Sequence, residues 1–417
     1  MLGPSTRNRP MNEALSIHWN EARRHEAAGD VAAARAAYEA LLALQPMQVV
    51  PRLRLSRFAQ LSDRYIESRS HALEAARIAA DGRVGKDAGF ISLRLLAFAE
   101  YTEVARLVES LDWSDEEVLK QSAVLAQHLW LAGRHEQALR FLDAVGLRVR
   151  PNPQLSGTRA NVLRSLGRLD EATGYYEHAL RLNPDDAYLH RSLAYHQPSA
   201  VAGARLPGIR AALARPRAEP VERAQLLYAL FKELDDQGDA GGAWEALAEG
   251  SAILRHASGH DRAAEARQFE SVRSMDVASA TPGSRDPEGQ VPIFIVGMPR
   301  TGTTLLERIL GNRPDAVALG ERNDFDAAIS LASDHFYRGG LHETDWRKLE
   351  RMDCRDAGAI YLGRVAPADV QCRFFIDKNP QNFFNIGLIL RALPHARILC
   401  LRRDPMDACF SNLKEVF

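Results

Sequence analysis

The feature that most constrains how this chain can fold is an internal repeat with a period of 34 residues. Gly133 and Gly167 stand at equivalent positions of two such repeats. Each is followed by arginine, then by alanine at the fifth position and by a large apolar or aromatic residue at the ninth. Similar patterns begin at Gly29 and, after an interruption rich in proline, at Gly238. A fixed period of about 20 to 50 residues is typical of stacked repeats, so we expect a helical array rather than one compact core.

Each repeat has the composition of two helices joined by a glycine turn. The glycine ends the first helix, the alanine permits close helix packing, and residues such as Tyr38 and Tyr176 fill the space between neighbouring pairs. Pro46 and Pro184 would stop the second helix. Because the period is that of tetratricopeptide repeats, we predict an α-helical solenoid of this type over residues 12–275. Such an array either supports the rest of the chain or docks a protein or peptide in its groove, and the sequence leaves both open.

The composition changes between residues 276 and 290, where small, charged and proline residues predominate. Such a segment cannot bury enough apolar surface to form a stable element, so we interpret it as a linker. Strand and helix patterns then alternate over residues 291–417. This alternation predicts an α/β domain of the P-loop type, with a parallel sheet whose ligands bind at the carboxyl ends of the strands. The expected strands are 291–296, 373–376 and 396–401, and the expected helical segments are 303–310, 323–365, 381–393 and 405–414.

A glycine-rich loop follows the first predicted strand. Gly297 and Gly302 have the spacing of a P-loop, and the next helix would direct its first N–H groups at a phosphate. In nucleotide triphosphatases a lysine follows the second glycine and contacts the terminal phosphates, but Thr303 stands at that position here. Arg300, inside the loop, supplies a cation instead. The loop is therefore expected to bind a nucleotide with a single phosphate at its 5′ end.

The string VGMPRTGTTLLERIL, which contains this loop, resembles the 5′-phosphosulfate loop of one enzyme family. The family is the sulfotransferases that use 3′-phosphoadenosine 5′-phosphosulfate, in the arginine form of the tyrosylprotein sulfotransferases. The resemblance implies that Arg300, Thr301, Gly302, Thr303 and Thr304 bind the phosphosulfate of this donor. It also implies transfer of a sulfuryl group to a hydroxyl-bearing acceptor without a metal ion.

A second match lies in LCLRRDP, where Arg403 ends a predicted strand and Ser411 follows on the next helix. This pattern resembles the family's site for the 3′ phosphate of the donor, which a guanidinium and a hydroxyl would bind together. Taken alone, Arg403 and Asp404 would more simply form a helix cap and a surface ion pair than a phosphate site. The longer string DKNPQNFFNIGLILRALPHARILCLRRDPMDACFS resembles proteins that join tetratricopeptide repeats to a sulfotransferase domain.

Sulfuryl transfer requires a base for the acceptor hydroxyl and a cation for the charge that develops on the leaving phosphate. Glu321 matches the position of the family's catalytic glutamate, and Lys378 matches its Lys-Asn-Pro element. Arg322 replaces the second glutamate of the usual Gly-Glu-Glu run, so Asp324 or a histidine remains an alternative base. Glu321 could otherwise stabilise a helix N-terminus, and Lys378 could be an exposed turn residue.

The overall composition excludes several classes of partner. With 53 Lys and Arg against 54 Asp and Glu, the net charge of −1 provides no general attraction to nucleic acid or to an anionic membrane. No secretory signal or apolar stretch long enough to span a membrane is evident, so we expect a cytoplasmic protein. The four cysteines form no CxxC pair, which argues against a structural metal or disulfide framework.

The part of the chain after residue 290 has 127 residues, about half of a complete domain of the resembled family, so we expect a domain incomplete at its carboxyl end. Three hypotheses for function remain. The chain is a sulfotransferase acting on a protein tyrosine or another hydroxyl, a P-loop nucleotide kinase or triphosphatase, or a repeat scaffold with a non-catalytic domain. The missing P-loop lysine argues against the second.

Overall fold

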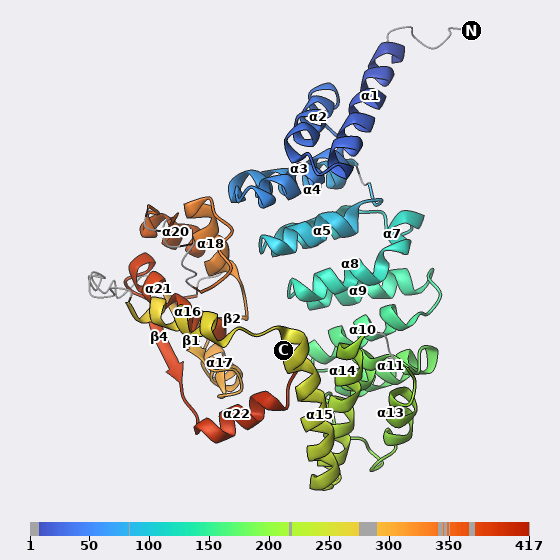
Figure 1. The fold of residues 1–417 in the computed structure, drawn as a ribbon, viewed down its shortest axis with the longest axis vertical. Coiled ribbons are helices and arrows are strands. Elements are labelled where there is room, and N and C mark those ends of the chain that lie inside the picture. The colour runs from blue at the N-terminus through green and yellow to red at the C-terminus, as the bar shows by residue number, and fades with distance from the viewer. Residues whose placement is uncertain are drawn as a thin grey trace. The chain divides into compact units, whose positions relative to one another are not determined.

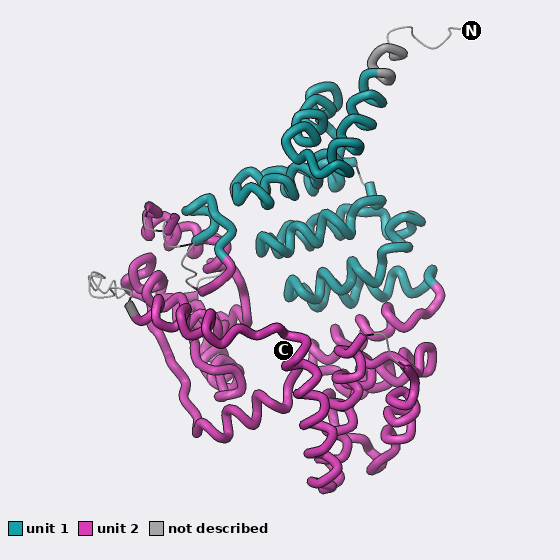
Figure 2. Tube along the Cα trace, viewed as in Figure 1, with its two compact units in different colours: residues 1–149, 329–337 teal, residues 150–328, 338–417 magenta. Residues whose placement is uncertain are grey.

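A computed structural model describes residues 8–82, 84–216, 219–274, 290–340, 345, 348–349, 351–366 and 372–416. The chain divides into two compact units, which Figure 2 distinguishes by colour. The first unit contains residues 1–149 and 329–337, and the second contains residues 150–328 and 338–417. The predicted linker, 276–290, lies outside the described residues except for Gln290. The predicted domain boundaries therefore stay a prediction.

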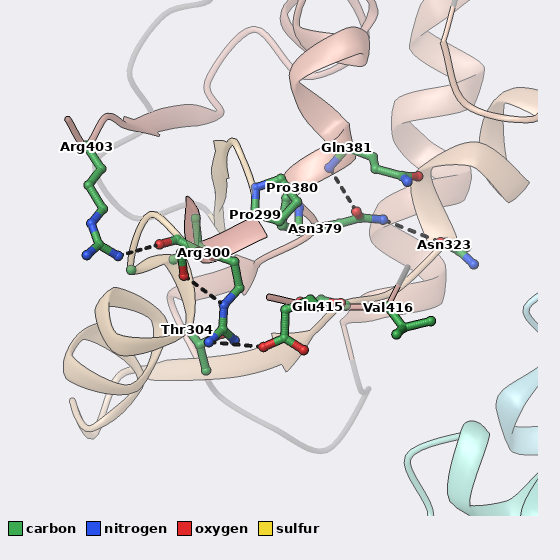
Figure 3. A pocket seen from close by; sticks show the side chains of 14 residues that line it. Pro299, Arg300, Thr304, Asn323, Asn379, Pro380, Gln381, Arg403, Glu415 and Val416 are labelled. Atoms are coloured by element: carbon green, nitrogen blue, oxygen red, sulfur yellow. Dashed lines mark hydrogen bonds and ion pairs between the residues drawn. The ribbon is translucent and has the colours of Figure 1, made fainter. Parts of the chain in front are cut away.

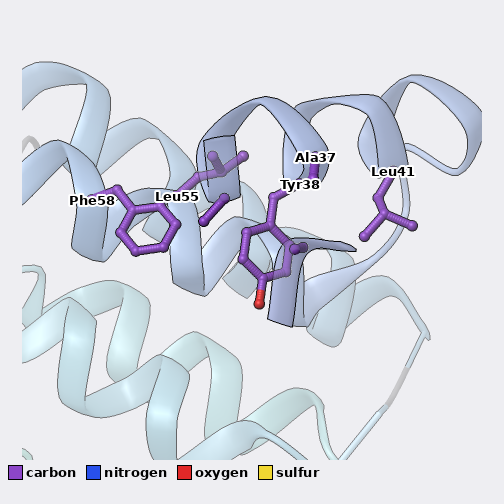
Figure 4. Packing of buried hydrophobic residues seen from close by; sticks show 7 residues of the cluster. Ala37, Tyr38, Leu41, Leu55 and Phe58 are labelled. Carbon is purple, nitrogen blue, oxygen red and sulfur yellow. The ribbon is translucent and has the colours of Figure 1, made fainter. Parts of the chain in front are cut away.

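The first unit is built from helices that pair along the chain (Figure 1). Gly133 has a φ of +70°, which only glycine adopts without strain, and it ends a helix as the repeat pattern predicts. Tyr38 is 1% exposed and packs against Phe58 of the next pair, with ring centroids 6.1 Å apart (Figure 4). The tyrosine therefore fills the space between pairs. The helices are α1 (Asn8–Ala27), α2 (Val31–Leu44), α3 (Val49–Leu61), α4 (Tyr65–Gly82), α5 (Ala88–Ala97), α6 (Tyr101–Ser110), α7 (Glu116–Lys120), α8 (Ser122–Leu131) and α9 (His135–Gly146).

A short segment from much later in the chain belongs to the first unit. The ring of Phe336 lies 5.0 Å from that of Tyr65 and 6.1 Å from that of Phe98. His335 contributes its ring Nδ1, which lies 2.7 Å from a carboxylate oxygen of Asp63. Residues 329–337 therefore complete an aromatic cluster of the helical array.

Among the described residues, the second unit begins with seven helices and continues with a four-stranded sheet. Gly167, with a φ of +76°, ends the first helix of its pair, as the repeat pattern predicts. The prediction of a helical solenoid followed by an α/β domain is confirmed. The helices are α10 (Pro153–Ser165), α11 (Leu169–Leu182), α12 (Ala187–Ala194), α13 (Leu206–Leu213), α14 (Pro220–Asp236), α15 (Ala240–Ser258) and α16 (Arg262–Ser274).

The sheet is entirely parallel and has the strand order β2-β3-β1-β4. Its core includes Phe294 of β1, whose ring lies 5.9 Å from that of Phe325 and 5.4 Å from that of Tyr361. The strands are β1 (Val291–Gly297), β2 (Ala316–Gly320), β3 (Phe374–Asp377) and β4 (Arg397–Leu401), and the helices are α17 (Thr303–Gly311), α18 (Asp324–Ser333), α20 (Cys354–Val365), the 3-10 helix η1 (Pro380–Asn385), α21 (Ile386–Ala392) and α22 (Pro405–Leu413).

Two features of this domain differ from the prediction. Strand β2 was not expected, because its sequence Ala-Val-Ala-Leu-Gly has one β-branched residue and no alternation. It forms because it pairs with β3, Ala316 opposite Phe374. The helix expected over 381–393 begins as the 3-10 turn η1 and becomes regular only in α21.

Strands β1 and β4 approach each other closely where the glycine loop begins. Gly297 has a φ of +142°, and a Cβ atom there would lie 2.6 Å from the carbonyl oxygen of Leu401. Only glycine fits this position. In the parts of the chain that the structure describes, no helix has the length and apolar character needed to cross a bilayer.

Candidate active site

The glycine loop connects β1 to α17 at the carboxyl edge of the sheet. Its backbone is unusual, because Arg300 has a φ of +68° and Gly302 a φ of +103°. The hydroxyl of Thr301 donates to the carbonyl of Met298 at 2.8 Å and holds the turn. Gly302 is the N-cap of α17 and has no side chain to satisfy the first N–H groups of that helix. The loop therefore presents backbone donors together with a cation, as an anion site requires.

A cavity of about 730 Å³ opens at this edge, and we call it the loop cavity (Figure 3). The segments that follow the three expected strands, 291–296, 373–376 and 396–401, all contribute to it. Of the predicted site residues, Arg300, Gly302, Thr303, Thr304, Glu321, Arg403 and Ser411 line it. The other lining residues are Pro299, Asn323, Asn379, Pro380, Gln381, Glu415 and Val416. Thr301 and Lys378 are outside this set, and Lys378 reaches the cavity through its contact with Glu321.

Glu321 and Lys378 follow the adjacent strands β2 and β3. The Lys378 ammonium donates to the Glu321 carboxylate, and its backbone N–H donates to the carbonyl of Gly320 at 3.1 Å. The side chain of Lys378 is 6% exposed, whereas that of Glu321 is 60% exposed. The lysine is therefore held against the sheet, and the carboxylate extends into the cavity.

A residue that sequence reasoning missed supports the turn before Glu321. Glu307 of α17 is 4% exposed, and its carboxylate accepts a hydrogen bond from the backbone N–H of Gly320 at 2.8 Å. Gly320 has a φ of +76°. Glu307 thus ties the end of β2 to the helix that follows the glycine loop. Its place within the string that matches the family was the signal that could have pointed to it.

Behind the cavity lies a buried acidic cluster. Asp377, fully buried, accepts hydrogen bonds from Tyr361 at 3.0 Å and from the side-chain amide of Asn382 at 3.2 Å. Burial, together with a smaller effect of the nearby charge of Asp324, raises the pKa of Asp377 to about 7. Burial also raises the pKa of Asp326 to about 6. The hydrogen bonds of Asp377 hold the end of β3 immediately before Lys378.

Asp324, the alternative base, does not suit that role. Its side chain is 1% exposed and accepts from Arg322 at 2.5 Å and from Arg364 at 3.0 Å. It is absent from the described lining of the loop cavity, as is any histidine. Two arginines instead engage it as a structural anchor between α18 and α20. Of the bases considered, Glu321 is the one that the geometry favours.

The residues predicted for the two phosphates meet in one place. The Nε of Arg300 donates to the hydroxyl of Ser411 at 3.4 Å, and Arg403 donates to the carbonyl of Arg300 at 3.2 Å (Figure 3). Arg300 also forms an ion pair with Glu415 at 3.2 Å. Glu415 was not predicted, because no motif includes it. Its carboxylate balances the charge of the Arg300 guanidinium.

Comparison with known proteins finds two families that match parts of this chain. Residues 292–417 match the model of the sulfotransferase family, and residues 155–186 match the tetratricopeptide repeat. An uncharacterized protein of Aquifex aeolicus (strain VF5) is 28% identical over 266 residues, which are 62% of this chain. The chain spans 34% of the length of that relative. The chain is thus a tetratricopeptide-repeat protein that carries a sulfotransferase-family domain.

Proposed function

We propose that this protein transfers a sulfuryl group from 3′-phosphoadenosine 5′-phosphosulfate to a hydroxyl group of an acceptor, with a protein tyrosine as the first acceptor to test. One observation carries the proposal. The glycine loop, with its arginine and without the P-loop lysine, shares the loop cavity with Arg403 and Ser411. A cavity of about 730 Å³ is within the range of about 300–1,000 Å³ typical of ligand sites.

The donor would be held at its 5′ phosphosulfate and at its 3′ phosphate. The N-terminus of α17, Thr304 and Arg300 would bind the 5′ phosphosulfate, with Arg300 leaving Glu415 for the ligand. Arg403 and Ser411 would bind the 3′ phosphate. Phosphate groups on both the 3′ and the 5′ position of the ribose distinguish this donor from ATP, whose phosphates form a single chain at the 5′ position. The position of the P-loop lysine is occupied by Thr303, which is 5% exposed.

The reaction needs one proton acceptor and one cation. Glu321 would take the proton of the acceptor hydroxyl as its oxygen attacks sulfur. The bond between sulfur and the bridging oxygen breaks, and the electron pair stays on the departing phosphate of adenosine 3′,5′-bisphosphate. Lys378 would stabilise the negative charge on that oxygen. The ion pair of these two residues supports the assignment, because it holds both groups beside the glycine loop.

The test is calorimetry with adenosine 3′,5′-bisphosphate and, separately, with ATP and Mg²⁺. We expect the bisphosphate to bind and ATP to bind much more weakly. Arg300→Ala should weaken bisphosphate binding by about tenfold to a hundredfold, the loss typical of one charged hydrogen-bonding group. Preferential binding of ATP would favour a nucleotide kinase instead, and binding of neither nucleotide would favour a scaffold.

A comparison of two nucleotides tests the assignment of Arg403 to the 3′ phosphate. Arg403→Ala should weaken binding of the bisphosphate by a similar factor. It should leave the binding of adenosine 5′-monophosphate, which lacks the 3′ phosphate, almost unchanged. Arg403 also donates to the carbonyl of Arg300, so a general disturbance of the loop would weaken both nucleotides equally. Equal weakening would therefore contradict the assignment of Arg403 to the 3′ phosphate.

A further inference from the structure

The end of α22 and the residues that follow it contact two parts of the second unit at once. We call residues 411–416 the bridging segment. On one side this segment meets the glycine loop, and on the other it meets α12 and α14 of the helical repeats. It therefore joins the proposed donor site to the repeats.

The contacts with the glycine loop involve polar side chains. The Nε of Arg300 donates to the hydroxyl of Ser411 at 3.4 Å, and the side-chain amide of Asn412 donates to the carbonyl of Pro299 at 2.9 Å. The carboxylate of Glu415 forms an ion pair with the guanidinium of Arg300 at 3.2 Å (Figure 3). A shift of the bridging segment would therefore move Ser411 and Glu415 relative to the loop.

Two tyrosine hydroxyls of the repeats hold the backbone of the same segment. Tyr228 of α14 donates to the carbonyl of Leu413 at 3.0 Å, and Tyr195, the C-cap residue of α12, donates to the carbonyl of Lys414. Burial raises the pKa of both hydroxyls, so they remain protonated donors at neutral pH. The ammonium of Lys414 also forms an ion pair with Asp235 of α14 at 3.1 Å. These contacts fix the path of the segment along the repeats.

Apolar packing supports these polar contacts. Leu413 and Val416 pack against the buried core of α14 and α15, to which Tyr228 and Phe231 belong. The ammonium of Lys414 lies 5.5 Å from the centre of the Phe231 ring, within the range of a cation–π interaction. The position of the bridging segment thus depends on the core of the repeats as well as on α22.

A role in holding two domains together would explain the tyrosine hydrogen bonds alone. It does not explain why the segment that they hold carries Ser411 and Glu415, which line the loop cavity. These two residues are four positions apart and contact the glycine loop, whereas Leu413 and Lys414 between them contact the repeats. Residues four positions apart on a helical turn lie on one face, so a single turn presents different residues to each side.

We propose that Tyr195 and Tyr228 are positioning residues for the donor. They hold the bridging segment so that the hydroxyl of Ser411 lies where the 3′ phosphate binds. Without their hydroxyls, two partly buried carbonyls lose their donors, which is unfavourable, and the segment shifts toward water. The inference rests on the proposed function, because that function assigns Ser411 to the 3′ phosphate. It gives the repeats one of the two roles that the sequence leaves open, support for the rest of the chain.

The test compares the affinities for adenosine 3′,5′-bisphosphate and adenosine 5′-monophosphate, measured by calorimetry. The ratio of the two affinities reports the interaction with the 3′ phosphate. In Tyr195→Phe/Tyr228→Phe, which removes both hydroxyls and keeps both rings, we expect this ratio to fall by at least about fivefold. Binding of the monophosphate should not weaken, because the hold of Glu415 on Arg300 is loosened at the same time. Tyr175→Phe, the same change on α11 and outside the loop cavity, should alter the ratio by less than about twofold.

A double-mutant cycle shows whether the tyrosines act through Ser411. Ser411→Ala should lower the ratio by a similar factor, and adding the two tyrosine substitutions to Ser411→Ala should lower it no further. Hydrogen exchange of residues 298–304 provides a measurement without nucleotide. Exchange in this loop should be faster in the tyrosine variant, because the loop loses the support of Asn412.

An unchanged ratio in the tyrosine variant would overturn the inference, as would a full additional loss in the background of Ser411→Ala. Equal weakening of both nucleotides would also overturn it, since this would indicate a general disturbance of the domain. Circular dichroism checks that each variant is folded. If the tyrosine variant is unfolded, Asp235→Asn, which removes the ion pair of Lys414, takes its place with the same expected fall in the ratio. Binding of neither nucleotide by the parent would reject the proposed donor and this inference together, whereas a parent that binds and a tyrosine variant with an unchanged ratio would reject the positioning role alone.

Discussion

The ammonium of Lys378 is ion-paired with the carboxylate of Glu321, although 57 residues separate them in the sequence. The pairing of β2 with β3 brings them together, because Gly320 lies opposite Asp377, and Glu321 and Lys378 directly follow these two residues. Carboxyl ends of parallel strands meet at one edge of a sheet, so groups from distant segments can share a site. The register of this one strand pair therefore sets the geometry of the proposed base and cation.

Replacing Glu321 tests its role as the base. Glu321→Gln should lower the rate of radiolabelled sulfate transfer from the donor to a tyrosine peptide by about 10²–10⁴-fold, the usual contribution of a general base. Calorimetric affinity for adenosine 3′,5′-bisphosphate should stay within a few-fold of the parent. Glu245→Gln, which changes an exposed glutamate of α15, serves as the control. Undiminished transfer by Glu321→Gln would exclude this residue as the base.

Removing the charge of Glu415 should release Arg300 for the donor. The two side chains form an ion pair at 3.2 Å, and that of Arg300 is 50% exposed. Ion pairs of this exposure contribute up to about 1 kcal/mol, so Glu415→Gln should tighten bisphosphate binding by up to about fivefold. The gain should disappear in the background of Arg300→Ala. Weaker binding by Glu415→Gln would show that the carboxylate assists the donor site rather than competing with it.

A pair of glycine substitutions separates backbone strain from helix propensity. Gly297→Ala should destabilise the second unit by at least about 2 kcal/mol, because the new Cβ would lie 2.6 Å from the carbonyl of Leu401 in a backbone conformation that alanine avoids. In Gly174→Ala, inside α11, the new Cβ atom would have no other atom within 4 Å. This substitution should stabilise the second unit by about 0.5–1 kcal/mol. Melting followed by circular dichroism measures both, and similar melting of the two variants would contradict the strain argument.

The buried carboxyl group of Asp377 should make stability depend on pH. Its pKa is raised from 3.8 to about 7 in the folded chain, so it favours folding most below about pH 4 and that contribution is lost as the pH rises through 7. Asp377→Asn removes this dependence. The free energy of unfolding of the variant, relative to the parent, should therefore increase by on the order of 1–4 kcal/mol between pH 4 and 8.

Denaturant unfolding at several pH values measures this difference. Asp170→Asn, at an exposed position of α11, is the matched control and should show a flat difference. A flat difference for Asp377→Asn as well would mean that the carboxyl group is ionised in the folded chain throughout this range.

Several features of this protein follow from short stretches of sequence. The glycine turns at Gly133 and Gly167 have φ values of +70° and +76°, which glycine adopts far more readily than other residues. Strand β1 is a continuous apolar run, and the loop that begins at Gly297 has a recognisable spacing. Each of these features depends on the backbone preference of a residue or on the spacing of apolar residues. It can therefore be predicted from residues that are close together in the sequence.

Other features depend on partners that are remote in sequence. Strand β2 has weak strand propensity and forms by pairing with β3. The pKa of Asp377 is raised because the fold buries its carboxyl group. Glu415 meets Arg300, and Tyr228 meets Leu413, only through tertiary packing. Local sequence thus determined the helical repeats and the glycine loop, since these reflect backbone preferences. Tertiary structure alone decided the charge balance and accessibility of the site, because burial and ion pairing depend on which distant residues meet.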